Sequence, residues 1–194
     1  MSSAAKYLFE AALEIQCFFN DNHWDFTLIG GLAVLRWGKP RTTYDVDGTL
    51  LTLFDHEDHY IDTLLARFKS RIADAKDFAL TYRVLLLTAS NDMAVDISLG
   101  GMPFEQQMVE RSSVFEYDKG YELRTCSAED LIVLKAFAAR DKDWADVDSI
   151  LRRQKGKLDT DYICENLKQL CEWKESPDIM AKFHQMLITT DQQR

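Results

Sequence analysis

The chain has 194 residues, 46% of them hydrophobic and 28% charged, and carries a formal net charge of −9. This length suffices to bury a substantial core in one domain, or in a domain with a helical appendage. The negative charge disfavours tight, non-specific binding to nucleic acid, so any RNA contact must be local or helped by a metal ion. No apolar run has the length of a membrane span or a signal peptide, and the four cysteines show no metal-ligand spacing. We therefore expect a soluble cytoplasmic protein with reduced thiols.

Helix and strand signals alternate along the chain up to about residue 125. An amphipathic helix is expected over 4–20, because apolar residues recur there at helical spacing. A strand over 25–29 then ends at Gly30-Gly31, and a helix over 32–37 follows. The remaining signals predict a strand over 44–54, a helix over 58–68, strands over 83–88 and 93–98 that form an antiparallel hairpin, a helix over 102–111 and a second hairpin within 114–123.

From Ser127 onward the signals are helical. Ser127 and Asp130 fit a capping box, in which the serine caps the helix and the acid stands in for the usual Glu or Gln. The pattern predicts helices over 127–140, 142–154, 159–172 and 177–189. We therefore expect an α/β part over 1–125 and a helical part over 126–194 that packs on it, with no flexible linker between them.

Asp45 and Asp47 form the most informative motif of the chain. Side chains two residues apart on a strand point to the same face. Two adjacent carboxylates repel each other unless a cation lies between them. Carboxylate oxygens suit Mg²⁺ or Mn²⁺, and Mg²⁺ commonly takes substrate phosphates as further ligands. The pair therefore predicts a divalent-metal site, while Gly48 directly after it predicts a weakened strand with a bulge.

Two further features support metal-assisted chemistry on a nucleotide. The Gly30-Gly31 pair at a strand-to-helix turn lets backbone N–H groups approach a phosphate closely. Asp96 lies within an apolar strand, where a lone acid is costly unless it is paired or binds a cation. If that strand lies beside the strand with the acid pair, three carboxylates converge on a metal site for phosphoryl chemistry. The alternative for Asp96 is a salt-bridged acid at a strand end.

These motifs, in this order, resemble the nucleotidyltransferase superfamily with a polymerase-beta-like fold. The matching residues are Gly30-Gly31, the run Arg41-Thr42-Thr43-Tyr44-Asp45-Val46-Asp47 and the later Asp96. The run over 127–135, followed by Arg140, Asp141, Lys142, Asp143 and Asp146, resembles the AbiEii/AbiGii-type branch, which contains toxins of bacterial toxin–antitoxin and abortive-infection systems. The resemblance covers residues 25–152. It implies an α+β fold, with a small mixed or antiparallel nucleotidyltransferase sheet flanked by helices and followed by a C-terminal helical bundle.

The resemblance also implies roles for individual residues. The ligands of Mg²⁺ or Mn²⁺ would be Asp45, Asp47 and Asp96, which would be catalytic together with Lys135. The nucleotide-binding residues would be Gly30, Gly31, Arg36, Arg41, Thr43, Lys135, Asp143 and Asp146. The implied reaction transfers a nucleotidyl group from a nucleoside triphosphate such as ATP to a hydroxyl of RNA, in particular tRNA, or of a protein. A cognate antitoxin is the implied partner, and no membrane is involved.

The helical motif has structural alternatives as well. Lys135 fits a surface lysine that extends its stem along apolar neighbours. Asp143 and Asp146 lie three residues apart, hence on one helix face, and fit a solvated acidic face near a helix N-terminus.

Two other interpretations of the whole chain stay open. The run from Asp45 to Thr52 also spells the first motif of haloacid-dehalogenase-type phosphatases, in which the first acid is a nucleophile. That motif normally follows a buried strand, whereas the residues before Asp45 are mostly polar. The second alternative is a catalytically degenerate scaffold that binds a partner protein through apolar side chains of the C-terminal helices.

Overall fold

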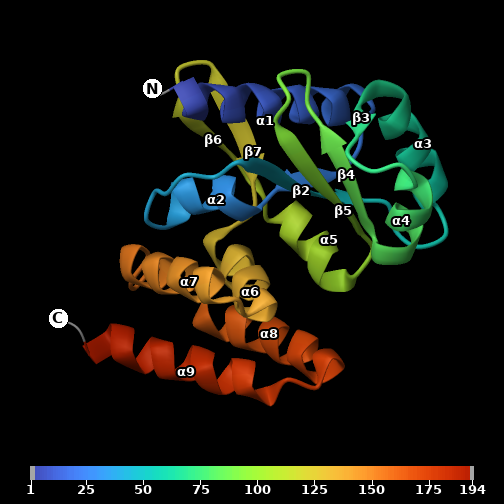
Figure 1. Ribbon diagram of the computed structural model, residues 1–194. Helices are drawn as coiled ribbons and strands as arrows, with labels where there is room; N and C mark the ends of the chain where they lie inside the picture. The colour runs from blue at the N-terminus through green and yellow to red at the C-terminus, as the bar shows by residue number, and fades with distance from the viewer. Residues whose placement is uncertain (1–2, 193–194) are drawn as a thin grey trace. The chain divides into compact units, whose positions relative to one another are not determined.

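The residues that the structure describes, 3–192, include a mixed sheet of seven strands (Figure 1). The structure is a computed structural model, and its sheet has the strand order β3-β4-β5-β2-β1-β7-β6. The strands are β1 (Phe26–Leu28), β2 (Asp45–Leu51), β3 (Lys69–Ser70), β4 (Val84–Thr88), β5 (Ala94–Gly100), β6 (Ser113–Asp118) and β7 (Tyr121–Thr125). β2–β5 and β1–β7 are parallel pairs, and the other neighbours are antiparallel.

The chain forms two compact units. The first comprises the described residues up to Leu32 together with Thr42–Cys126, and the second comprises Ala33–Arg41 and the chain from Ser127. The helices up to the end of the sheet are α1 (Ser3–Asp21), α2 (Gly30–Trp37), α3 (Glu57–Arg67), α4 (Ala75–Tyr82) and α5 (Pro103–Glu110). The later helices, all in the second unit, are α6 (Ala128–Ala138), α7 (Asp141–Arg153), α8 (Thr160–Lys174) and α9 (Pro177–Gln192).

The fold class predicted from the sequence is confirmed: a mixed sheet is flanked by helices and followed by a set of helices. Both predicted hairpins form, as β4–β5 and β6–β7. Two elements were missed, β3 and α4, which lie between residues 68 and 83 where no element was expected. The helix expected over 32–37 begins two residues earlier, so the two glycines form its first turn and do not precede it.

Alternating burial along β2 and β5 separates the core from the acids. Val46, Leu50, Val95 and Ile97 are fully buried, and each such side chain contributes about 1.5–3 kcal/mol by leaving water. The bulge expected at Gly48 is absent, because β2 keeps a continuous register with β5 along its length. A Cβ at Gly48 would lie only 3.3 Å from Cδ1 of Ile97, so the glycine makes room for a core side chain.

In the second unit, α6 is buried over much of its surface. Ser127 caps the helix: its Oγ accepts a hydrogen bond from the Asp130 backbone N–H at 3.1 Å and donates one to the Asp130 carboxylate at 2.6 Å. Tyr162 of α8 donates a further hydrogen bond to the fully buried Asp130 at 2.7 Å. The predicted cap is therefore confirmed. Of the helices in the described part of the chain, none combines the length and apolarity needed to cross a bilayer.

Candidate active site

Asp45, Asp47 and Asp96 lie on one face of the sheet. The register of β2 and β5 pairs Asp45 with Ala94 and Asp47 with Asp96. Side chains paired in a parallel ladder, and those two residues apart on a strand, point to the same side. The three acids are partly exposed, whereas Val46 between the first two is fully buried. The structure therefore brings together the three carboxylates that the sequence singled out.

The pKa of the Asp96 carboxyl is raised above its ordinary value. The main cause is burial, which disfavours the charged form, and repulsion from the nearby Asp45 carboxylate acts in the same direction. The Arg71 guanidinium opposes this rise, because it forms an ion pair with Asp96. Each side chain of the pair is 34% exposed, so solvent reaches it. Asp96 thus already has a cationic partner within the chain.

The three acids are near one another but are not gathered around a single point. Within residues 3–192, no three His, Cys, Asp or Glu side chains are arranged so that they could hold one metal ion together. The donor set itself fits Mg²⁺ or Mn²⁺, since it consists of carboxylate oxygens on one face of adjacent strands. Joint ligation by all three acids would require Asp96 to leave Arg71.

The Gly30-Gly31 pair, at the start of α2, lies directly against the acid pair of β2. Gly30 has a φ of 62°, and a Cβ there would lie 1.8 Å from Oδ2 of Asp47. A Cβ at Gly31 would lie 2.2 Å from Oγ1 of Thr43, whose hydroxyl donates a 2.9 Å hydrogen bond to Asp45. Only glycine allows this approach. The start of a helix also favours anions, because its backbone N–H groups and its dipole point toward them.

Lys135, Asp143 and Asp146 form a buried ion network in the second unit. The Lys135 Nζ lies 3.0 Å from Oδ1 of Asp143 and 3.0 Å from Oδ2 of Asp146. Arg41 donates two hydrogen bonds of 2.8 Å to Asp146, and Arg140 donates two, of 2.5 and 3.4 Å, to Asp143. Lys135, Asp143 and Asp146 are 7%, 0% and 3% exposed. The surface-lysine and solvated-acid alternatives are therefore wrong.

The network lowers the pKa of both aspartates. Burial alone would raise the pKa of the Asp143 carboxyl, but hydrogen bonds from Arg140 and Lys135 outweigh burial. Burial likewise opposes the lowered pKa of Asp146, which hydrogen bonds from Arg41 and Lys135 produce. Both acids are therefore held in their charged form.

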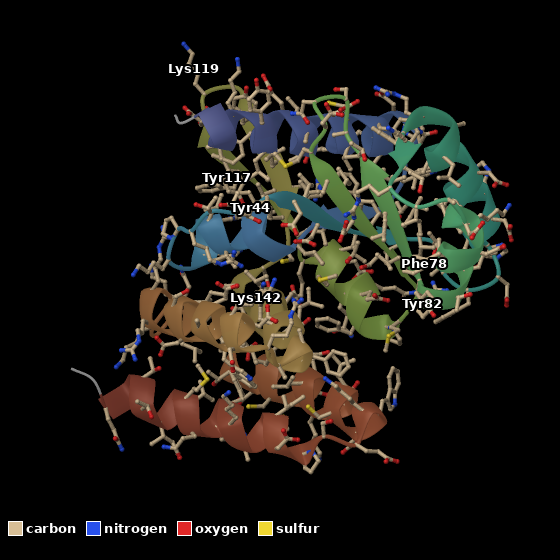
Figure 2. All side chains as sticks on the ribbon, viewed as in Figure 1. Tyr44, Phe78, Tyr82, Tyr117, Lys119 and Lys142 are labelled. Carbon is tan, nitrogen blue, oxygen red and sulfur yellow. The ribbon has the colours of Figure 1, made fainter. Side chains whose placement is uncertain are left out.

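Sequence reasoning missed two exposed residues near the acids of β2 and β5. Arg71 follows the short strand β3, which had no sequence signal, so nothing indicated that it would meet Asp96. Tyr44 directly precedes Asp45 and is 78% exposed, a large value for an aromatic ring (Figure 2). Its exposure could have been suspected from the polar residues around it. The predicted nucleotide contact Arg36 lies in the second unit, with its guanidinium 4.1 Å from the ring centroid of Trp37.

The haloacid-dehalogenase interpretation does not agree with the placement of the acids. Asp45 is the first residue of β2, and Asp47 lies within the strand. The phosphatase motif instead begins after a buried strand. A mixed sheet with carboxylates on adjacent strands, beside a helix that starts with two glycines, agrees instead with the nucleotidyltransferase resemblance of the sequence.

Comparison with known proteins gives the family. The model of a family described as nucleotidyl transferase of unknown function (DUF2204) matches residues 8–185, and the chain belongs to this family. The protein is therefore an enzyme of the nucleotidyltransferase class. A search of curated protein sequences gives no significant match.

Solved structures show the same fold. An antigenic nucleotidyltransferase-like protein from Paracoccidioides brasiliensis is 15% identical with a TM-score of 0.51, over 93% of this chain and 94% of that one. The antibiotic-resistance factor ANT(2″)-Ia, in a solution structure, is 13% identical with a TM-score of 0.52, over 95% of this chain and 98% of the other. At such low identities the likeness establishes the fold alone.

Proposed function

We propose that the protein transfers a nucleotidyl group from a nucleoside triphosphate, with ATP as the first candidate, to a hydroxyl of tRNA or of a protein. The acceptor hydroxyl gives up its proton to a base, for which Asp96 is the candidate, and its oxygen forms a bond to the α-phosphorus. The bond from the α-phosphorus to the oxygen that bridges it to the β-phosphorus breaks, and pyrophosphate leaves. The observation that carries this proposal is the common face of Asp45, Asp47 and Asp96 beside the glycine start of α2. The same arrangement supports a site that holds phosphates and divalent charge together.

The residues proposed to hold Mg²⁺ or Mn²⁺ are Asp45, Asp47 and Asp96. A bound ion would supply positive charge to the triphosphate and to the leaving pyrophosphate. Thr43 fixes Asp45 through its hydrogen bond, and Gly30 lets the helix start reach Asp47. These contacts orient the carboxylates before any ligand binds. Such preorganisation of charged groups is a main source of rate acceleration in sites of this kind.

Phosphate contacts are proposed for the backbone of Gly30 and Gly31, because the N–H groups at a helix start are suited to anions. A further proposed contact is Lys135. An ammonium has three donors, and Asp143 and Asp146 take two of them, which leaves one for a phosphate oxygen. In this proposal the two aspartates position the lysine and do not touch the nucleotide.

The other proposed nucleotide contacts have weaker support. Arg41 is already bound to Asp146 by two hydrogen bonds, and Arg36 stacks on Trp37. We expect Arg41 to fix the segment that leads into Thr43 and Asp45, two and four residues later in the chain. The exposed ring of Tyr44 is suited to stacking on a nucleobase, since every base offers a π face.

The acceptor and the biological role rest on the sequence resemblance to the AbiEii/AbiGii-type branch. We propose a toxin whose cognate antitoxin is a separate protein. The net charge of −9 favours acceptors that are recognised locally, either a defined hydroxyl of tRNA or a hydroxyl side chain of a protein, over long stretches of RNA backbone.

The direct test is incubation of the protein with each α-³²P-labelled nucleoside triphosphate, Mg²⁺ or Mn²⁺, and either total tRNA or cell protein. We expect one nucleotide to label one acceptor fraction, and Asp47→Asn to lower the rate of labelling by about 10³-fold. Glu116→Gln, an exposed acid on β6, is the matched control and should label normally. Absence of label in every combination, or full labelling by Asp47→Asn, would refute the proposal.

A further inference from the structure

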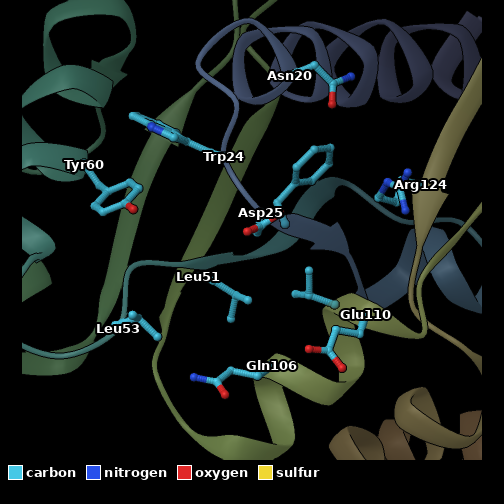
Figure 3. A pocket seen from close by; sticks show the side chains of 11 residues that line it. Asn20, Trp24, Asp25, Leu51, Leu53, Tyr60, Gln106, Glu110 and Arg124 are labelled. Carbon is cyan, nitrogen blue, oxygen red and sulfur yellow. The ribbon is translucent and has the colours of Figure 1, made fainter.

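A cavity of about 570 Å³ lies in the first unit, at the end of β2 that is remote from the acids (Figure 3). Leu51, the last residue of β2, lines it, whereas Asp45 is the first residue of that strand. The six steps from Asp45 to Leu51 correspond to about 20 Å, and the four steps from Asp47 to about 13 Å. The cavity is therefore separate from the proposed transferase site, and its volume is in the range of small-molecule pockets.

The lining of the cavity includes aromatic rings and several apolar side chains. Trp24 and Tyr60 lie beside each other with ring centroids 4.8 Å apart, and Figure 3 shows both on the same side of the cavity. Phe26 and Val109, which also line the cavity, are buried at 3% and 8% exposure. Two adjacent rings and neighbouring apolar side chains suit a ligand with an apolar body.

The polar groups of the cavity carry mostly negative charge. Asp25 and Glu110 both line it, and within residues 3–192 neither carboxylate has an ion-pair or hydrogen-bond partner. The amides of Asn20 and Gln106 add neutral acceptors and donors at the rim. Arg124 also lines the cavity, but its guanidinium points to Ser112, with Nη1 3.3 Å from the Ser112 hydroxyl.

We propose that this cavity binds a small organic cation, an ammonium group joined to an aromatic or alkyl body. The faces of Trp24 and Tyr60 attract a cation through the negative face of each ring. The carboxylates of Asp25 and Glu110 supply the opposite charge. The same two carboxylates repel a phosphate or a nucleotide, so the cavity does not serve as a second triphosphate site. The net charge of −9 raises the local concentration of cations further.

This inference is independent of the proposed transferase reaction, and its test uses binding alone. Benzyltrimethylammonium is titrated into ¹⁵N-labelled full-length protein, and the Trp24 indole N–H resonance is followed, with benzyl alcohol as the neutral match and benzoate as the anionic one. We expect saturable shifts of Trp24 with the cation, and none of comparable affinity with the other two ligands.

Variants of the lining residues separate the contribution of the carboxylates to cation binding from that of the aromatic rings. Asp25→Asn with Glu110→Gln should weaken binding of the cation about five- to tenfold, the scale of two exposed charge pairs. Tyr60→Leu should weaken it by removing one ring, and Glu116→Gln on β6 should leave it unchanged. Thermal unfolding of each variant checks that the fold is retained. Equal binding of benzyl alcohol, no shift at Trp24, or unchanged affinity in the double variant would overturn the proposal.

Discussion

Two pairs of aspartates in this chain have similar spacing and different surroundings. Asp45 and Asp47, two apart on a strand, are partly exposed and lie beside Thr43 and the glycine start of a helix. Asp143 and Asp146, three apart on a helix, are almost fully buried and each contacts two cationic side chains. Carboxylates that are almost fully buried against cationic side chains hold a structure, whereas carboxylates that are partly open to solvent can act on a ligand.

The sharpest test of this comparison is Asp47→Asn. The amide keeps the shape that fits against Gly30 but removes the charge. We expect the rate of nucleotidyl transfer to fall by about 10³-fold, because loss of one preorganised electrostatic contact typically lowers kcat by about that factor. The melting temperature should stay close to that of the unmodified protein. Initial rates with labelled nucleotide and circular-dichroism melting measure the two quantities.

The corresponding change in the helical pair, Asp143→Asn, should act on stability. It removes one of the two acids that Lys135 contacts and leaves that buried lysine with Asp146 alone, so we expect a loss of unfolding free energy toward the lower end of the 3–5 kcal/mol that a broken buried ion pair costs, about 3 kcal/mol. Urea denaturation measures this loss of unfolding free energy. Asp148→Asn, on the same helix but partly exposed, is the control and should change stability little. A stable but inactive Asp143→Asn would show that the comparison is wrong.

Gly30→Ala tests whether the glycine start of α2 supports Asp47. The new Cβ would collide with the Asp47 carboxylate. The alanine would also have to adopt a φ of 62°, a backbone strain of about 1–3 kcal/mol. We expect transfer to fall by about ten- to a hundredfold, with kcat affected more than KM. Gly120→Ala, also at positive φ but with open space around it, controls for backbone strain alone. Equal activity losses in both variants would argue against a specific role for Gly30.

Arg71→Met should produce a smaller change, an increase in the affinity for Mn²⁺. The variant frees Asp96 from its ion pair, so the protein without nucleotide should bind Mn²⁺ about two- to fivefold more tightly, as expected for a partly exposed pair. Electron paramagnetic resonance of Mn²⁺ measures this affinity. Weaker Mn²⁺ binding by the variant would show that Arg71 supports the site instead of competing for Asp96.

The smallest effect is a pH dependence of stability. The folded-state pKa values of Asp143 and Asp146 lie below the ordinary 3.8. Their contribution to stability is therefore complete above 3.8 and is lost as the pH falls through the lowered values. Urea midpoints should decline below about pH 4, and Asp143→Asn should flatten that decline. An unchanged slope in the variant would assign the acid sensitivity to other groups.

Local patterns predicted most of the fold. Apolar periodicity located the sheet strands 1, 2, 4 and 5 and the helices after residue 127, and the Ser127 cap formed as expected. β3 was missed because two residues carry no periodicity, and α4 because its polar residues gave no clear apolar stripe. The exposed acid pair could be recognised because both residues lie in one short motif.

Long-range contacts were beyond sequence reasoning. The pairing of Arg71 with Asp96 spans 25 residues, and that of Arg41 with Asp146 spans 105. Burial of Lys135 could not be read from its apolar neighbours, because a surface lysine has the same local pattern. Such contacts depend on the register of the sheet and on helix packing, which a single sequence does not specify.

The central claim is that the acids of β2 and β5 gather around one divalent ion beside the start of α2. It is tested most directly by anomalous diffraction from crystals grown with Mn²⁺ and a non-hydrolysable ATP analogue. We predict a manganese peak at ligand distance, about 2.1 Å, from carboxylate oxygens of Asp45 and Asp47, with Asp96 separated from Arg71 and turned toward the ion. A manganese peak elsewhere, with the Asp96–Arg71 pair intact and the phosphates away from Gly30, would contradict the account.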